Sequence, residues 1–219
     1  MSGYPLKLST VLLVLGLAAG PLQAHSTQDH SAHQVHEQPP AGTQVRFADV
    51  TLTDRQEHPV RLKEDLVADK IVVMGFIYTS CTTVCPVISA IMQKVQRQLG
   101  ERVGAQVQLV SISVDPLRDT PARLREYSQR YQPGPGWAWL TGSVQAVTDT
   151  LKGLGTWSAD YEDHQPVIMV GDGRSAQWTS FYGFTDPSVL VAKVEELSAA
   201  REHSAHTSHQ AAIEPGVRP

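Results

Sequence analysis

The chain has 219 residues, of which 41% are hydrophobic and 18% charged, and 18 basic against 22 acidic residues give a formal net charge of −4. This composition is that of one ordinary globular domain, and it excludes a fibrous or wholly disordered protein. No run of five or more like charges occurs, so the chain lacks the basic patch that is typical of nucleic-acid-binding proteins.

The first 24 residues have the pattern of a secretory signal peptide. Lys7 is the only charge before Asp29, and the apolar run 8–19 is about half as long as a membrane span. Cleavage after Ala24 fits the small-residue rule, with an uncleaved membrane anchor as the alternative. Export places the chain in the periplasm or another extracytoplasmic space, soluble or tethered by this segment, where a dithiol stays reduced only through a reductase or a metal.

Polar segments flank the part of the chain that has regular patterns. Residues 25–43 contain Pro39-Pro40, and residues 203–219 end in Glu-Pro-Gly-Val-Arg-Pro. Both are predicted to be disordered tails that contain histidines. The folded domain is therefore expected over residues 44–202.

The first half of this domain is predicted to alternate strands and helices. Apolar side chains alternate or run continuously in the predicted strands and recur on one face in the predicted helices. Pro86 at the first helical position and Gly100 just past the end mark the first helix, and Asp119 or Thr120 is the expected cap of the second. The expected elements are strands over residues 45–53, 71–78 and 107–114 and helices over residues 86–99 and 121–131.

The second half predicts a short strand, a helix, a hairpin and a final helix. A Gly-Asp-Gly turn joins the last two strands, which are therefore expected to be antiparallel. The order is that of a thioredoxin-like α/β sandwich, with a central mixed sheet flanked by helices and an N-terminal strand extension. Met74, Trp137, Trp139 and Met169 lie on predicted strands and are expected in the core. The elements are a strand over 137–140, a helix over 143–154, strands over 167–170 and 177–182, and a helix from Pro187 with Asp186 as its cap.

Cys81 and Cys85 are the only cysteines, and they lie between the central strand and the first helix. Residues four apart on a helical turn have Cβ atoms about 5 to 6 Å apart, so the two sulfurs can share one metal ion or form a disulfide. No charged residue occurs from Ile71 to Gln93. Two thiolates in apolar surroundings favour Cu(I), with Zn(II) second, while a purely stabilising bridge is the alternative.

His164 is the predicted third ligand. It lies just before the strand expected over 167–170, and in this topology the preceding loop faces the helix that carries the cysteines. Asp163 is a candidate to orient the imidazole or to approach the metal itself. A surface imidazole and an ordinary solvated loop carboxylate are the alternatives for these two residues.

The chain contains the motifs Phe76-Ile-Tyr-Thr-Ser-Cys81, Cys85-Pro86, Ser113-Val-Asp115-Pro-Leu-Arg-Asp119-Thr-Pro121, Leu140-Thr-Gly142 and Asp163-His164. On these motifs it resembles the Sco/SenC family of copper-binding proteins over residues 47–197. The family often has proline directly after the first cysteine, where this chain has Thr82, and the segment from His164 to the next turn is shorter here than in well-known members.

This resemblance implies a thioredoxin-like fold, a copper site at Cys81, Cys85 and His164, and export or membrane tethering. It also implies work in delivering copper to, or reducing the thiols of, the binuclear copper centre of cytochrome c oxidase. The expected partners are a copper-accepting protein, such as the copper-bearing subunit of that oxidase, and a reductant for the dithiol.

The leading hypothesis is an exported chaperone that holds copper, as Cu(I) or Cu(II), and passes it on by ligand exchange, so a carrier is expected rather than an enzyme. The alternative is a thiol-disulfide oxidoreductase in which Cys81 and Cys85 cycle between dithiol and disulfide. Three intervening residues favour a shared metal, because two is the usual redox spacing. A peroxidase fits less well, since Tyr78 stands where a peroxiredoxin-style Thr-x-x-Cys motif has proline.

Seven of the nine histidines lie in the two predicted tails, and the tetrapeptide His-Ser-Ala-His occurs in both. Imidazoles three residues apart can share one Cu(II), Zn(II) or Ni(II) ion. Solvated tails with incidental histidines are the alternative. The tail residues predicted to bind metal are His25, His30, His33, His36, His203, His206 and His209.

Overall fold

The structure, a computed structural model, describes residue 42 and residues 44–213, with side chains up to residue 207. The predicted signal peptide over residues 1–24 lies outside this range. Nearly all of the predicted N-terminal tail also lies outside it, including His25, His30, His33 and His36.

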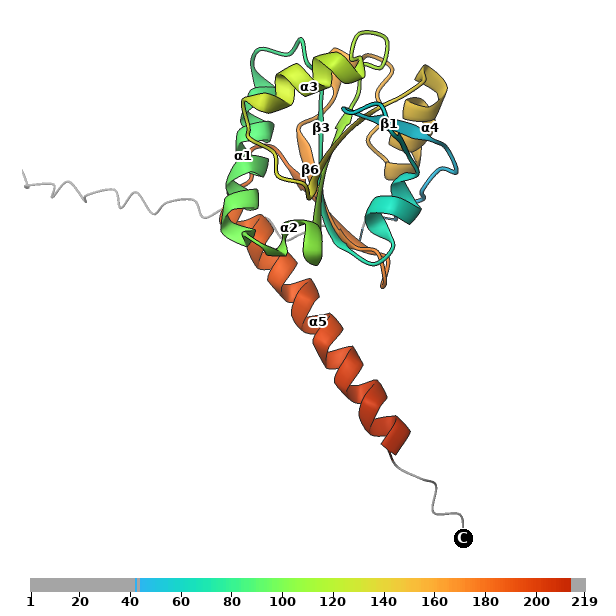
Figure 1. Ribbon diagram of the computed structural model, residues 1–219, viewed down its shortest axis with the longest axis vertical. Helices are drawn as coiled ribbons and strands as arrows, with labels where there is room; N and C mark the ends of the chain where they lie inside the picture. Colours follow the sequence, from blue (N-terminus) through green and yellow to red (C-terminus); the bar gives the residue numbers. More distant parts are fainter. Residues whose placement is uncertain (1–41, 43, 214–219) are drawn as a thin grey trace, which may run out of the picture. The chain divides into compact units, whose positions relative to one another are not determined.

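Seven strands form one mixed sheet in the order β2-β1-β5-β4-β3-β6-β7 (Figure 1). The central strands β3, β4 and β5 pair in parallel, whereas β6, β7, β1 and β2 extend the sheet through antiparallel pairs. The predicted antiparallel hairpin is therefore confirmed. The strands are β1 (Leu52–Asp54), β2 (Pro59–Val60), β3 (Ile71–Ile77), β4 (Val107–Ser113), β5 (Trp137–Thr141), β6 (Val167–Asp172) and β7 (Gln177–Tyr182).

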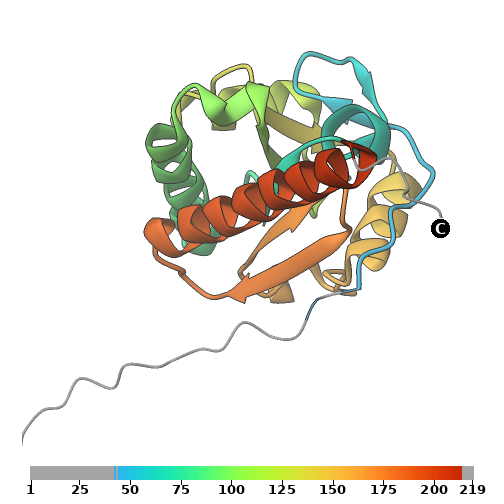
Figure 2. The ribbon, with the colours of Figure 1, turned by 90° about the horizontal axis from the view of Figure 1, so that it is seen from below.

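Helices pack against both faces of the sheet (Figure 2). One face is covered by α1 (Val84–Leu99), α3 (Pro121–Gln129) and the first part of α5 (Pro187–Ile213). The other face is covered by α4 (Val144–Leu154) and the π-helical turn η1 (Leu62–Val67). The short helices α2 (Arg102–Ala105) and η2 (Tyr161–Asp163) lie in connecting segments. The predicted mixed sheet flanked by helices is confirmed.

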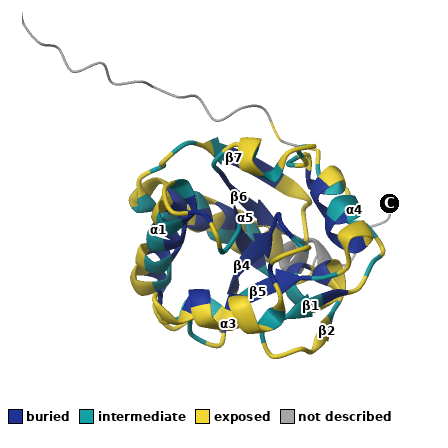
Figure 3. Ribbon diagram, turned by 90° about the horizontal axis from the view of Figure 1, so that it is seen from above, coloured by how far each residue is buried: buried dark blue, intermediate teal, exposed yellow. Residues whose placement is uncertain are grey.

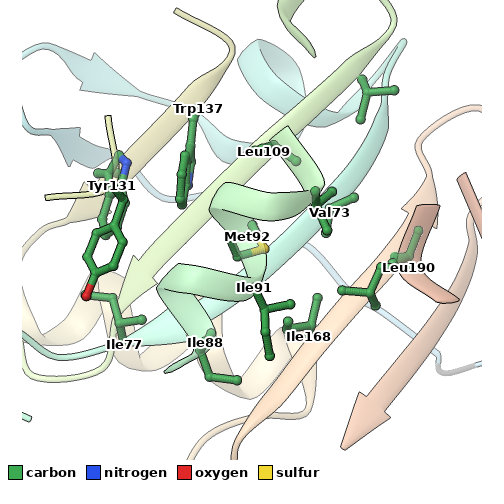
Figure 4. Close-up of a cluster of buried hydrophobic side chains, with 14 of the residues drawn as sticks. Val73, Ile77, Ile88, Ile91, Met92, Leu109, Tyr131, Trp137, Ile168 and Leu190 are labelled. Carbon is green, nitrogen blue, oxygen red and sulfur yellow. The ribbon is translucent and has the colours of Figure 1, made fainter. Parts of the chain in front are cut away.

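Both faces of the central strands are buried, because helices cover them from each side (Figure 3). This explains why β3 and β4 are almost continuously apolar in sequence. On the α1 face, Ile88 and Met92 of α1 belong to the same cluster of buried side chains as Val73 of β3 and Leu190 of α5 (Figure 4). The predicted core residues are confirmed, since the structure buries Met74, Trp137, Trp139 and Met169 to within 1% of full burial.

The strand predicted over residues 45–53 is much shorter, because β1 begins only at Leu52. The residues before it pack on the α4 face without a strand partner: the Arg46 N–H donates to the Gly153 carbonyl oxygen at 2.8 Å, and Phe47 meets Trp178 edge-on. Their alternating apolar side chains still face the core. The alternating pattern therefore predicted correctly that these side chains are buried. It was wrong in predicting that the backbone before Leu52 pairs with a neighbouring strand.

The prediction of a disordered tail from His203 onward is wrong for residues 203–213, which continue α5 as helix. Arg201 ties this helix to the sheet, since its guanidinium donates to the Asp172 carboxylate and to the Asp69 carbonyl oxygen. The polar composition suggested disorder, but the segment is rich in alanine and lacks proline and glycine up to Ile213, which favours a helix.

Within the residues that the structure describes, no helix has the length and apolar character needed to cross a bilayer.

Candidate metal-binding site

Cys81 and Cys85 lie together where β3 leads into α1. Cys81 is in the connecting loop, and Cys85 is in the first turn of the helix, which begins at Val84 after Thr83 as its N-cap. The prediction that Pro86 starts the helix is therefore two residues late. The backbone N–H of Cys85 donates to the Cys81 sulfur at 3.3 Å. This hydrogen bond holds the two cysteines together, although they do not both lie on one helical turn as expected.

Both thiols are free and almost fully buried, with 8% of Cys81 and 5% of Cys85 exposed. Burial raises the pKa of Cys81, but hydrogen bonds from the N–H groups of Cys85 and Thr83, the Cys85 thiol and the Tyr78 hydroxyl outweigh it and lower that pKa to about 7. Burial, together with the neighbouring Cys81 thiol, raises the pKa of Cys85 to about 12. The pair is thus one readily ionised thiol beside one that stays protonated.

Tyr78 is a site residue that sequence reasoning missed. Its hydroxyl is hydrogen-bonded to the Cys81 sulfur, and burial raises the pKa of Tyr78, so the hydroxyl remains a donor at neutral pH. The residue ends the apolar run of β3 and packs against the cores on both faces of the sheet. The sequence shows a tyrosine three residues before a cysteine, but only the fold shows that the two side chains form a hydrogen bond.

Asp119 is a second residue whose role the sequence did not reveal. It was a candidate cap of α3, but Thr120 has that role, accepting a hydrogen bond from the Arg123 N–H at 3.3 Å. Asp119 is instead buried and accepts hydrogen bonds from the Thr79 N–H and hydroxyl and from the Ser113 hydroxyl. It therefore fixes the segment that leads into Cys81.

The buried Asp119 carboxyl also changes the electrostatics of the thiols. Burial raises the pKa of Asp119, while its hydrogen bonds from Ser113 and Thr79 oppose that change. When ionised, this carboxylate raises the pKa of Cys85. The expectation of surroundings without charge therefore holds for the local sequence but not for the folded site, because Asp119 comes from a loop that is distant in sequence.

His164 follows η2 and lies beside Phe76 of β3, with ring centroids 5.6 Å apart. Its Nε2 atom is buried and has no hydrogen-bond partner among the described residues. Burial lowers the pKa of His164 to about 4, so the imidazole is neutral at pH 7. A neutral imidazole with a free nitrogen has the chemical form of a metal ligand.

The structure does not gather the three predicted ligands into one cluster. In residues 42 and 44–213, no three His, Cys, Asp or Glu side chains converge in the manner of a metal site. The cysteines pack in the core under α1, whereas His164 borders a cavity of about 160 Å³ lined by Leu117, Thr148 and Trp157. Coordination of one ion by all three residues therefore requires these side chains, or the segments that carry them, to rearrange.

The remaining predicted residues are separate from the thiol pair. Asp163 is exposed, and its N–H donates to the Asp160 carbonyl oxygen at 3.2 Å. His203 and His206 are exposed on α5, and the backbone of His209 continues that helix.

Comparisons with known proteins agree with this fold. BsSco, a member of the Sco family of cytochrome c oxidase assembly proteins, superposes with a TM-score of 0.60 at 24% identity, covering 73% of this chain and 96% of BsSco. Arabidopsis thaliana ScoI with copper bound gives a TM-score of 0.59 at 22% identity, covering 70% of this chain and 98% of that one. The predicted thioredoxin-like sandwich is therefore confirmed.

Sequence comparisons identify the family. A Stutzerimonas stutzeri protein named for copper binding is 35% identical over 83 residues, which is 38% of this chain and 40% of the relative, so the match spans about two fifths of the relative's length. The family model described as SCO1/SenC matches residues 38–199, which include both cysteines and His164. The chain therefore belongs to the SCO1/SenC family.

Proposed function

We propose that this protein is an exported copper carrier that binds one copper ion through Cys81, Cys85 and His164 and passes it to a copper-accepting protein. The observation that carries the proposal is the pair of free, buried thiols held in contact by the Cys85 N–H. Two thiolates in a dry setting suit Cu(I) above most biological metals. Copper is the cargo here, and the residues of this chain take it up and release it.

The donor set of this site fits copper. Cys81 ionises near neutral pH without a neighbouring cation, because hydrogen bonds stabilise its thiolate. A bound cation would itself favour loss of the Cys85 proton. The unpartnered Nε2 atom of His164 supplies a neutral third donor once its segment moves toward the thiols.

Ligand exchange is the transfer step that this arrangement supports. A partner donor can enter as one ligand of the carrier leaves, so copper need not be released into solution. His164 is the ligand suited to leave first, because the structure already gives it a separate resting place beside Phe76. The copper-bearing subunit of cytochrome c oxidase is the proposed acceptor, since BsSco is in a family of assembly proteins for that oxidase.

A competition with a coloured Cu(I) chelator tests this function. The reduced full chain should retain one copper, while Cys81→Ser and Cys85→Ser should lose it by orders of magnitude in affinity and His164→Ala by at least about tenfold. His58→Ala is the matched control, because this exposed histidine pairs with Asp54 on the β1–β2 turn. Unchanged copper retention in the two serine variants would overturn the carrier proposal, and unchanged retention in His164→Ala would remove only the third ligand.

Thiol-disulfide exchange is the second candidate, and the unequal thiols favour it. The Cys81 thiolate would attack a partner disulfide, forming a mixed disulfide and releasing one partner thiolate. Cys85, after losing its proton, would then attack Cys81, which closes the intramolecular disulfide and releases the second partner thiolate. The partner disulfide is reduced by two electrons and the cysteine pair is oxidised by two. Rapid turnover by the metal-free dithiol with a recycling reductant would favour this function over copper carriage.

A further inference from the structure

The exposed end of α5 presents histidines at helical spacing. The helix passes the point where Arg201 fastens it to the sheet and continues to Ile213 (Figure 1). His203 and His206 follow within two turns, and both are exposed. On a helix, side chains three residues apart are neighbours with Cβ atoms about 5 to 6 Å apart. The two imidazoles therefore lie on one strip of the helix surface.

We propose that His203 and His206 form a second metal site, one that binds a divalent cation of the Zn²⁺, Cu²⁺ or Ni²⁺ class on the surface of α5. Two imidazoles are the nitrogen ligands that these borderline cations favour, and water completes the coordination. The helix already places the two side chains next to each other before any metal binds, so the site needs little rearrangement to form. The same spacing recurs at His209, whose backbone also lies on α5, so His206 is shared by both possible pairs.

This site is independent of the thiol pair. Arg201 binds Asp172, which lies opposite Ile71 at the beginning of β3, whereas Cys81 follows the far end of that strand. The seven residues of β3 span about 20 Å at roughly 3.3 Å per residue. An ion on α5 therefore cannot use Cys81 or Cys85 of the same molecule as ligands. The inference does not depend on the proposed copper carriage.

Metal binding should also stabilise the end of α5. Two hydrogen bonds already hold this part of the helix: the Ser204 hydroxyl donates to the Ala200 carbonyl oxygen at 2.9 Å and the Thr207 hydroxyl to the His203 carbonyl oxygen at 3.0 Å. An ion that binds the helical form but not the frayed form shifts the equilibrium between them. Free zinc at one hundred times its dissociation constant should lower the population of the frayed state about a hundredfold.

The test uses the full chain carrying Cys81→Ser and Cys85→Ser, so that the thiols take up no zinc. Zn²⁺ is added, and NMR follows the imidazole signals of His203 and His206 together with amide hydrogen exchange of residues 200–207. In this parent protein we expect both imidazoles to shift together and the amide protection to rise. His206→Ala should lose both effects, because it removes the shared ligand.

A composition control separates a helical site from loose chelation. Ser204→His combined with His206→Ala keeps the number of histidines but leaves none three or four residues apart on the helix, so it should behave like His206→Ala. Circular dichroism without zinc checks that all three proteins have the same helix content. The proposal would be overturned if zinc had no effect on the parent protein. It would also be overturned if zinc had equal effects on the parent and on the double variant.

Discussion

The ring of Tyr161 meets the ring of Tyr78 edge-on, with centroids 5.0 Å apart and planes at 83°. On the same ring of Tyr161, the Arg118 guanidinium lies 5.1 Å from the centroid, and Arg118 is itself paired with Asp115. Tyr161 begins the short helix that leads into His164, and Tyr78 is hydrogen-bonded to Cys81. The segment that carries the proposed third ligand therefore packs directly on a residue that controls the first.

Removing the hydroxyl of Tyr78 should raise the pKa of Cys81. Tyr78→Phe keeps the ring but deletes one of the hydrogen bonds that stabilise the Cys81 thiolate, so the pKa of about 7 should rise by about 1 unit. The pH dependence of the alkylation rate of the reduced protein measures this change. Tyr161→Phe is the control, because the Tyr161 hydroxyl is hydrogen-bonded to Glu162 and its ring contact would remain. An unshifted alkylation profile in Tyr78→Phe would contradict the assigned hydrogen bond.

Asp119 should be important for stability. Asp119→Ala leaves the Thr79 N–H and two hydroxyl groups without their acceptor in a buried place, so the free energy of unfolding should fall by about 3 to 5 kcal/mol. Asp119→Asn keeps one carbonyl acceptor and should cost less than half of that. Urea unfolding gives these values.

Thr120→Ala is the matched comparison for Asp119→Ala. It removes the adjacent α3 cap and should cost about 1 kcal/mol, because Thr120 makes one capping bond at the protein surface. Equal losses for the Thr120 and Asp119 alanine variants would show that the carboxylate does not anchor the cysteine segment.

The partly buried imidazole of His164 should make the fold sensitive to acid. The unfolded chain takes up a proton at this residue below about pH 6.5, whereas the folded protein does so only below a pKa of about 4. Stability from this group is therefore present above pH 6.5 and is lost as the pH falls toward 4. The loss should be about 3 kcal/mol in the free energy of unfolding.

Comparison with His164→Gln isolates the contribution of His164. The free energy of unfolding of both proteins is measured in urea at pH 7 and at pH 4. All other titrating groups are the same in the two proteins, so the difference between their losses of stability gives the contribution of the imidazole. If the two proteins lose the same amount of stability between these pH values, His164 is not held as a buried neutral group.

Copper and the oxidation state of the cysteines should oppose one another. A Cys81–Cys85 disulfide would remove both thiolate ligands, so the oxidised protein should bind Cu(I) weakly, and bound copper should slow alkylation and oxidation of the thiols. Mass spectrometry after a timed exposure to an alkylating reagent, with and without one equivalent of copper, measures this protection. Identical alkylation in both samples would argue against copper binding at the thiols.

Local sequence patterns were sufficient for the elements whose burial is uniform. The apolar runs of β3 and β4 and the β6–β7 hairpin are properties of short segments, so the fold class and the place of the cysteines could be predicted. The turn of that hairpin lies after Asp172 rather than at Gly-Asp-Gly, because Gly171 and Asp172 still pair with β7. The start of α1 was displaced by two residues, because Pro86 stands at its third rather than its first position. Proline tolerates both places, since neither N–H has an acceptor within the helix.

The surroundings of the thiols could not be predicted in the same way. Asp119 and Tyr161 reach the site from loops 38 and 80 residues away from Cys81, and only the pairing of strands brings those loops together. The resting place of His164 also depends on tertiary packing, because the side chain lies beside Phe76 rather than the sulfurs. Sequence patterns indicated which residue types were present but not which pairs are in contact.

The C-terminal part of α5 is a suitable place to attach a probe or a support, because it extends away from the end of the domain that carries the cysteines. From Arg201 to Ile213 the helix extends about 18 Å at roughly 1.5 Å per residue, and Arg201 fastens this part at the end of the strands opposite Cys81. A fluorophore, affinity handle or solid support attached near residue 213 would be kept apart from the cysteines by a stiff spacer. Immobilisation through this helix should leave the edge that carries the thiols facing the solution, where an incoming protein could dock without hindrance.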